Sequence, residues 1–99
     1  MNNRRDKTPK SPEGDIDNMK LEIITPEQIY FSGEVTSVTL PGTSGLFTVW
    51  ENHAPLISSL KEGKISYVAD KSETVLNVDG GFAEISNNVV TVCLELVNS

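Results

Sequence analysis

Apolar and polar residues alternate along most of the chain after residue 18, which is the pattern of half-buried β-strands. The clearest run covers residues 89–96, because side chains at every second position of a strand share one face. One face of this run carries Val90, Val92, Leu94 and Leu96, and the other carries Thr91, Cys93 and Glu95. Residues 89–96 are therefore predicted to form a strand with one face in the core.

Six further runs have the same character and stop at turn-forming residues. They cover residues 20–25, 35–40, 46–50, 64–70, 73–78 and 82–86. The last run ends at Asn87-Asn88, a pair that predicts a turn. Residues 56–60 have the apolar spacing of a short helical turn, although Pro55 and two serines weaken that prediction. Residues 52–55 are predicted to be extended but outside a central strand, because Pro55 has no N–H to donate. The pattern as a whole indicates an all-β sandwich or flattened barrel.

The first 18 residues differ in composition from the rest of the chain. They hold one aliphatic side chain besides Met1, which is Ile16, together with two prolines and eight charged residues. Such a segment cannot bury enough apolar surface to offset the entropy lost on ordering it. We therefore predict a disordered N-terminal tail over residues 1–18 and one domain over residues 19–99.

The net charge of −6 belongs to the predicted domain. The tail holds equal numbers of basic and acidic residues, whereas residues 19–99 hold four lysines, no arginine and ten acidic residues. Nucleic-acid binding needs clustered basic side chains, so a nucleic-acid partner is not expected. No apolar run approaches the roughly 20 residues of a membrane span, and the N-terminus lacks the apolar stretch of a signal peptide. A cytosolic protein without membrane insertion is expected.

The segment GLFTVWENHAPL holds the only tryptophan and the only histidine, Trp50 and His53. A nucleophilic site would need His53 beside an activated Ser58, Ser59 or Cys93 and a third group to orient it, and the sequence has no recognisable motif of this kind. One histidine with one neighbouring acid supplies too few ligands for a metal. Gly80-Gly81 is followed by neither a lysine nor a helix, so a phosphate loop is not expected. No catalytic residue, cofactor or metal site is predicted.

Six motifs, in chain order, resemble a known family. They are FSG at 31–33, GTSG at 42–45, HAPL at 53–56, KEG at 61–63, GGFAEI at 80–85 and VTVC at 90–93. Their order and spacing are similar to those of the N-terminal domain of the epsilon subunit of F-type ATP synthases, over nearly all of residues 20–96. The resemblance implies a flattened β-sandwich of about 8–10 short strands, in agreement with the alternation pattern.

The resemblance also implies a function. The family's domain is a non-catalytic rotor component at the foot of the central stalk, bound to the gamma subunit and resting on the ring of c subunits. It couples ion-driven rotation of the ring to ATP synthesis. The implied location is peripheral, at the cytoplasmic face of the bacterial inner membrane. By position in the family motifs, Thr25, His53 and Ser58 are expected to face gamma.

This sequence departs from the family pattern in two places. Many members continue into a C-terminal helical hairpin that restrains ATP hydrolysis and in some binds ATP, whereas this sequence stops at Ser99, so a short form without that brake or nucleotide site is expected. The family's ring-facing loop often carries an acidic residue where this chain has Leu46. We expect Thr43, Ser44 and Leu46 to form a ring-facing tip whose contact is apolar at Leu46. The competing hypothesis is a stand-alone β-sandwich that binds an extended peptide at a sheet edge.

Overall fold

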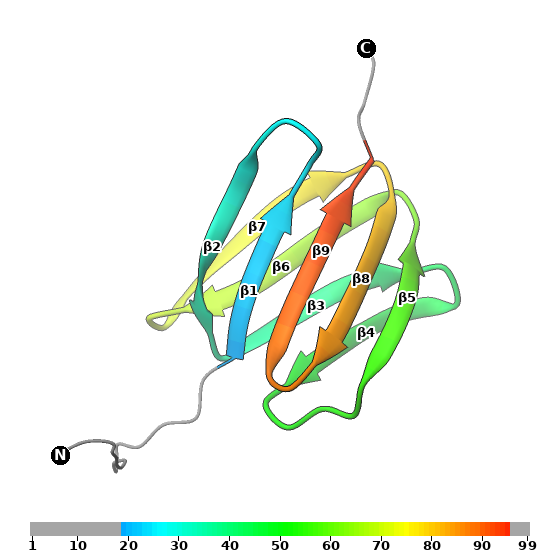
Figure 1. Ribbon diagram of the computed structural model, residues 1–99. Helices are drawn as coiled ribbons and strands as arrows, with labels where there is room; N and C mark the ends of the chain where they lie inside the picture. The colour runs from blue at the N-terminus through cyan, green and yellow to red at the C-terminus, as the bar shows by residue number, and fades with distance from the viewer. Residues whose placement is uncertain (1–18, 96–99) are drawn as a thin grey trace, which may run out of the picture.

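The computed structural model describes residues 19–95 and shows nine strands in that range (Figure 1). The tail predicted over residues 1–18, and the prediction for Leu96, lie outside the described residues. The strands are β1 (Met19–Ile24), β2 (Ile29–Val35), β3 (Ser37–Gly42), β4 (Gly45–Trp50), β5 (Leu56–Leu60), β6 (Gly63–Ala69), β7 (Ser72–Val78), β8 (Gly81–Ser86) and β9 (Val89–Leu94). The all-β prediction is confirmed.

The strands form one sheet in the order β2-β1-β9-β8-β5-β3-β6-β7, with β4 paired to the free side of β3. The sheet curls over on itself, so that β2, β1, β9, β8 and β5 form a first layer and β4, β3, β6 and β7 form a second layer behind it (Figure 1). The two layers join where Gly42 of β3 pairs with Leu60 of β5. This arrangement matches the predicted flattened β-sandwich.

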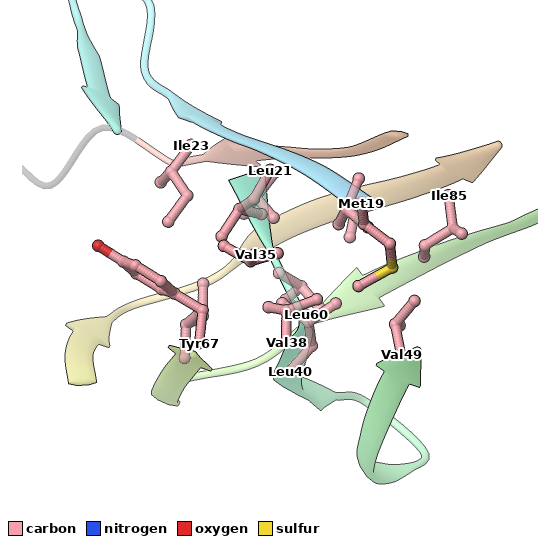
Figure 2. Packing of buried hydrophobic residues seen from close by; sticks show 14 of the residues in the cluster. Met19, Leu21, Ile23, Val35, Val38, Leu40, Val49, Leu60, Tyr67 and Ile85 are labelled. Carbon is pink, nitrogen blue, oxygen red and sulfur yellow. The ribbon is translucent and has the colours of Figure 1, made fainter. Parts of the chain in front are cut away.

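Apolar side chains fill the space between the layers (Figure 2). They come from every second position of the strands, as the alternation predicts: Met19, Leu21 and Ile23 from β1, Val38 and Leu40 from β3, Ile65 and Tyr67 from β6, and Val90 and Val92 from β9. None of the buried side chains in residues 19–95 is polar or charged. Each fully buried aliphatic side chain contributes about 1.5–3 kcal/mol relative to an exposed one, so this layer of contacts is the main source of stability.

Two predictions about strands were wrong. Residues 56–60 form β5 rather than a helical turn, because Leu56 and Leu60 point inward while Ile57 between them points outward and is 71% exposed. An apolar residue on the outer face hides the alternation. The strand β2 was missed because it is an edge strand whose residues Ile29 and Tyr30 are exposed. The predicted strand 35–40 is divided at Thr36 between β2 and β3.

The β8–β9 hairpin has the two-residue turn that Asn87-Asn88 predicted. Ser86 pairs with Val89, and both asparagines have a positive φ, 53° and 63°. Asparagine tolerates the left-handed region, and two such residues give a turn whose twist matches that of the flanking strands. Residues 52–55 lie outside the strands, as predicted from Pro55. Asn52 is not extended as predicted, because it lies in a turn with a φ of 63°.

Candidate interaction surface

The outer face of the first layer carries a row of apolar side chains across its strands. The register places Phe82 of β8 opposite Cys93 of β9, and Cys93 opposite Ile24 of β1. Residues that are opposite in a ladder point to the same face, and Ala83 and Val92 next to them are fully buried. The row therefore faces outward, and Phe82 is 49% exposed although it is a large aromatic side chain.

This row forms the floor of an open hollow of about 630 Å³ at the end of the layer where β1 stops and β8 begins. Ile24, Phe82, Cys93 and Leu94 supply apolar lining, and Thr25, Ser59 and Glu95 stand at its polar edge. A mainly apolar hollow with a few polar groups is the usual form of a binding surface for a partner side chain or small molecule. This hollow, together with the row of Ile24, Cys93 and Phe82 on its floor, is called the first-layer hollow below.

Thr25 lies at the edge of this hollow and organises the turn between β1 and β2. Its backbone N–H donates to the carbonyl of Gln28 at 2.9 Å, and its hydroxyl oxygen accepts from the N–H groups of Glu27 and Gln28 at 3.3 and 3.2 Å. A threonine hydroxyl commonly stabilises such a turn. Thr25 thus fixes the shape of the loop that borders the hollow.

His53 lies at the opposite end of the first layer, in the connection between β4 and β5. Thr25 follows the end of β1 near the start of β8, whereas His53 lines a small hollow with Asn87 and Asn88, beyond the end of β8. The ring nitrogen Nδ1 of His53 lies 2.8 Å from the carbonyl oxygen of Ala54, to which it donates when protonated. Thr25 and His53 therefore lie at opposite ends of the first layer.

Ser58 does not present its side chain on this face. It pairs with Ala83, which is fully buried, and its hydroxyl donates to the carbonyl of Ser59 at 3.1 Å. The outward-pointing residues of β5 are Ile57 and Ser59, on either side of it. Of the three residues expected to face gamma, the structure places Thr25 and His53 at opposite ends of the first layer and Ser58 on the inward side of β5.

Sequence reasoning did not single out Phe82 or Ile57 as surface residues. The signal for Phe82 was present, because the alternation of residues 82–86 places Phe82 on the same face as Glu84 and Ser86. An aromatic residue in line with polar ones on a strand marks an exposed apolar position. Ile57 was hidden by the helical prediction for residues 56–60.

Thr43, Ser44 and Leu46, the expected ring-facing residues, lie together at the β3–β4 hairpin. Thr43 and Ser44 form the loop, and its backbone is held by a bond from the Thr43 N–H to the Ser59 carbonyl at 3.0 Å. Leu46 is 71% exposed and pairs with Pro41. The tip therefore combines an exposed apolar side chain at the start of β4 with a short loop that is bonded to β5.

The described residues offer no cluster suited to metal chemistry. Within residues 19–95, no three residues of the types His, Cys, Asp and Glu are close enough to hold a metal ion. No helix in the same range is long and apolar enough to cross a membrane. The features that remain as candidates for binding are the first-layer hollow and the exposed side chain of Leu46.

A family model described as "ATP synthase, Delta/Epsilon chain, beta-sandwich domain" matches residues 18–97. The chain belongs to this family. The epsilon chain of Chlorobium limicola is 48% identical over 80 residues, which are 80% of this chain and 91% of that one. The epsilon chain of Leptospira interrogans serovar copenhageni is 39% identical over 74 residues, and this match spans 58% of its length.

Solved structures share the fold at low sequence identity. A chain from the mitochondrial ATP synthase of Euglena gracilis, solved as an OSCP/F1/c-ring assembly, superposes with a TM-score of 0.74 and 18% identity, over 92% of this chain and 61% of that chain. A chain from the central stalk and c ring of the mitochondrial ATP synthase of Tetrahymena thermophila superposes with a TM-score of 0.68 and 11% identity, over 81% of this chain and 65% of that chain. The delta/epsilon chains of ATP synthase are not catalytic by themselves, so membership in this family confirms the non-enzyme prediction.

Proposed function

We propose that this chain is a rotor subunit of the central stalk that links the gamma subunit to the c ring, so that ion-driven rotation is coupled to ATP synthesis. The observation that carries the proposal is the first-layer hollow with Phe82 on its floor and Thr25 at its edge. An exposed aromatic side chain at an apolar hollow is the usual anchor of a protein–protein contact. The chain then lies peripherally, at the cytoplasmic face of the bacterial inner membrane.

Two surfaces give the chain the two contacts that this role requires. The first-layer hollow faces gamma, and the β3–β4 tip with Leu46 faces the ring. The tip is joined to the first layer by the bond from Thr43 to Ser59, and Ser59 also lines the hollow. A rigid β-sandwich between the two contacts transmits torque without a chemical step of its own.

The proposal is tested by binding the full chain to isolated gamma subunit and measuring ATP turnover by the chain alone. We expect a stable one-to-one complex and no turnover. Circular dichroism of the same sample verifies that the domain is folded. If the folded chain does not bind gamma but binds extended peptides, the peptide-binding hypothesis is favoured instead. If the chain alone turns over ATP and His53→Ala abolishes the turnover, the protein is an enzyme and the proposal is wrong.

Leu46→Asp is expected to weaken docking on a gamma–c-ring complex about tenfold, which corresponds to 1.4 kcal/mol, with little change in thermal stability. Leu46 is largely exposed at the start of β4, so it adds little to the core, while a charge there is desolvated when the tip meets an apolar partner. Docking is measured on reconstituted rings and stability by thermal denaturation. Val75→Asp is the control, because Val75 is an exposed apolar strand residue on β7. Equal losses of stability and docking in Leu46→Asp would contradict the assignment of the tip.

A further inference from the structure

Two turns that are far apart in the sequence are bonded to each other through asparagine side chains. The side-chain oxygen Oδ1 of Asn88 accepts a hydrogen bond from the backbone N–H of Asn52 at 2.5 Å. The Asn88 amide nitrogen Nδ2 in turn donates to Oδ1 of Asn52 at 3.4 Å. The β4–β5 connection and the β8–β9 turn accordingly lie side by side at the lower end of the molecule (Figure 1). This pair of bonds is called the asparagine clasp below.

The backbone around the clasp suits asparagine at both positions. Asn52 and Asn88 each have a φ of 63°, in the left-handed region that asparagine and glycine tolerate better than other residues. The carbonyl of Asn88 also accepts from the N–H of Lys20 at 2.9 Å, which ties the turn to the start of β1. Asn88 therefore bonds two separate segments at once, β1 through its backbone and residue 52 through its side chain.

The clasp acts on the segment that presents His53. Residues 51–55 lie between β4 and β5 outside the sheet, so no strand ladder orders them. The clasp fixes Asn52, the residue directly before His53, to the end of the β8–β9 hairpin. His53, Pro55, Asn87 and Asn88 with Asn52 then line one small hollow. Without the clasp, the segment would keep its two covalent ends and lose its bonds to the hairpin, which raises its conformational freedom.

We propose that Asn88 is a positioning residue for the His53 end of the partner surface. It holds residues 52–55 in one conformation before binding, so that the partner does not have to order them at the cost of affinity. The proposal rests on the proposed function, in which His53 faces gamma. Asn88 need not touch gamma, because it acts through Asn52.

The experiment uses three variants of the full chain. Asn88→Gly removes the side chain but keeps a residue that adopts the positive φ, so the turn is retained. Asn88→Asp keeps an oxygen that accepts from the Asn52 N–H but removes the Nδ2 donor of the longer bond to Asn52 Oδ1. Asn87→Gly is the matched control, because Asn87 sits in the same turn with a φ of 53° and takes no part in the clasp.

Three readouts are followed: hydrogen exchange of the Asn52 amide, the NMR signals of the single histidine, and the dissociation constant for gamma. In Asn88→Gly we expect exchange to accelerate at least about tenfold and the dissociation constant to rise about 5- to 10-fold, as for loss of a net hydrogen bond and of preorganisation. The His53 ring signals should also shift, since its loop is no longer held. Asn87→Gly should stay within about twofold of the parent in both quantities, which is below 0.5 kcal/mol. Asn88→Asp, which keeps the shorter bond and loses the longer one, should fall between Asn87→Gly and Asn88→Gly.

The outcomes distinguish a failure of the positioning role of Asn88 from a failure of the proposed function. If Asn88→Gly accelerates exchange at Asn52 but binds gamma as the parent does, the positioning role is overturned. If Asn87→Gly has the same effects as Asn88→Gly, the turn rather than the clasp is responsible and the proposal also falls. If the parent chain does not bind gamma, the proposed function fails, and the exchange and histidine signals alone decide whether the clasp orders residues 52–55.

Discussion

Gly81→Ala is expected to destabilise the chain by about 2–6 kcal/mol, from a strained backbone at about 1–3 kcal/mol and overpacking at about 1–3 kcal/mol. Gly81 begins β8 with a φ of 143°, which side chains rarely adopt. A Cβ at this position would lie 2.2 Å from the carbonyl oxygen of Cys93, which belongs to the paired backbone of β9. Because that neighbour is backbone held in the ladder between β8 and β9, it cannot move without disturbing the ladder.

The matched control for this variant is Gly45→Ala. Gly45 has almost the same φ, 138°, but an added Cβ there meets no atom within 4 Å. It therefore carries the backbone strain without the overlap, and we expect a loss of about 1–3 kcal/mol, smaller than that of Gly81→Ala by the cost of overpacking. For a domain of this size, 1 kcal/mol corresponds to roughly 4–8 °C in Tm, so thermal denaturation distinguishes the two variants easily. Equal shifts in Tm would show that the close approach of Gly81 to β9 carries no energetic weight.

Phe82→Thr is expected to weaken gamma binding about 30-fold, the loss of about 2 kcal/mol that defines an interface anchor. Phe82 lies on the floor of the first-layer hollow with half of its surface exposed, so it has apolar area left to bury against a partner. Threonine is compatible with a strand, and the side chain at this position points away from the core. The fold should therefore survive the substitution. Titration of gamma with each variant gives the affinity, and circular dichroism verifies the fold.

Val75→Thr is the control for this experiment. Val75 is 54% exposed on β7 of the second layer, so the substitution removes exposed apolar area from the opposite layer without changing the side-chain shape. We expect its affinity for gamma to equal that of the parent. A Phe82→Thr chain that is folded and binds like the parent would remove the hollow from the gamma contact and leave the proposed orientation without its main support.

Much of the fold could be predicted from the sequence because its signals are local. The alternation of residues 89–96 predicted the inward face of β9, and Val90 and Val92 are indeed fully buried. Asn87-Asn88 predicted the tight turn, since the left-handed conformation is a property of those residues. The strand β5 could not be predicted in this way, because Ile57 places an apolar side chain outside the core and breaks the pattern.

The candidate surface could be predicted only in part. The resemblance of the motifs pointed to Thr25, His53 and the tip with Leu46. These residues lie in or beside turns at the ends of strands, and the positions of turns can be read from the local sequence. It also pointed to Ser58, whose side chain faces inward because its partner in the ladder is Ala83. One step along a strand reverses the direction of a side chain, so the face of a residue depends on the register with the neighbouring strand.

The sequence by itself determined the all-β class, the family, and the absence of a recognisable catalytic motif, since these follow from periodicity, residue types and collinear motifs. Only the tertiary structure decided what lies next to what. Phe82, Cys93 and Ile24 come from three strands and form one row, and Asn52 and Asn88 are 36 residues apart and form one clasp. Such neighbours are created by the pairing of distant strands, and the pattern along a single strand contains no record of the register in which it will pair.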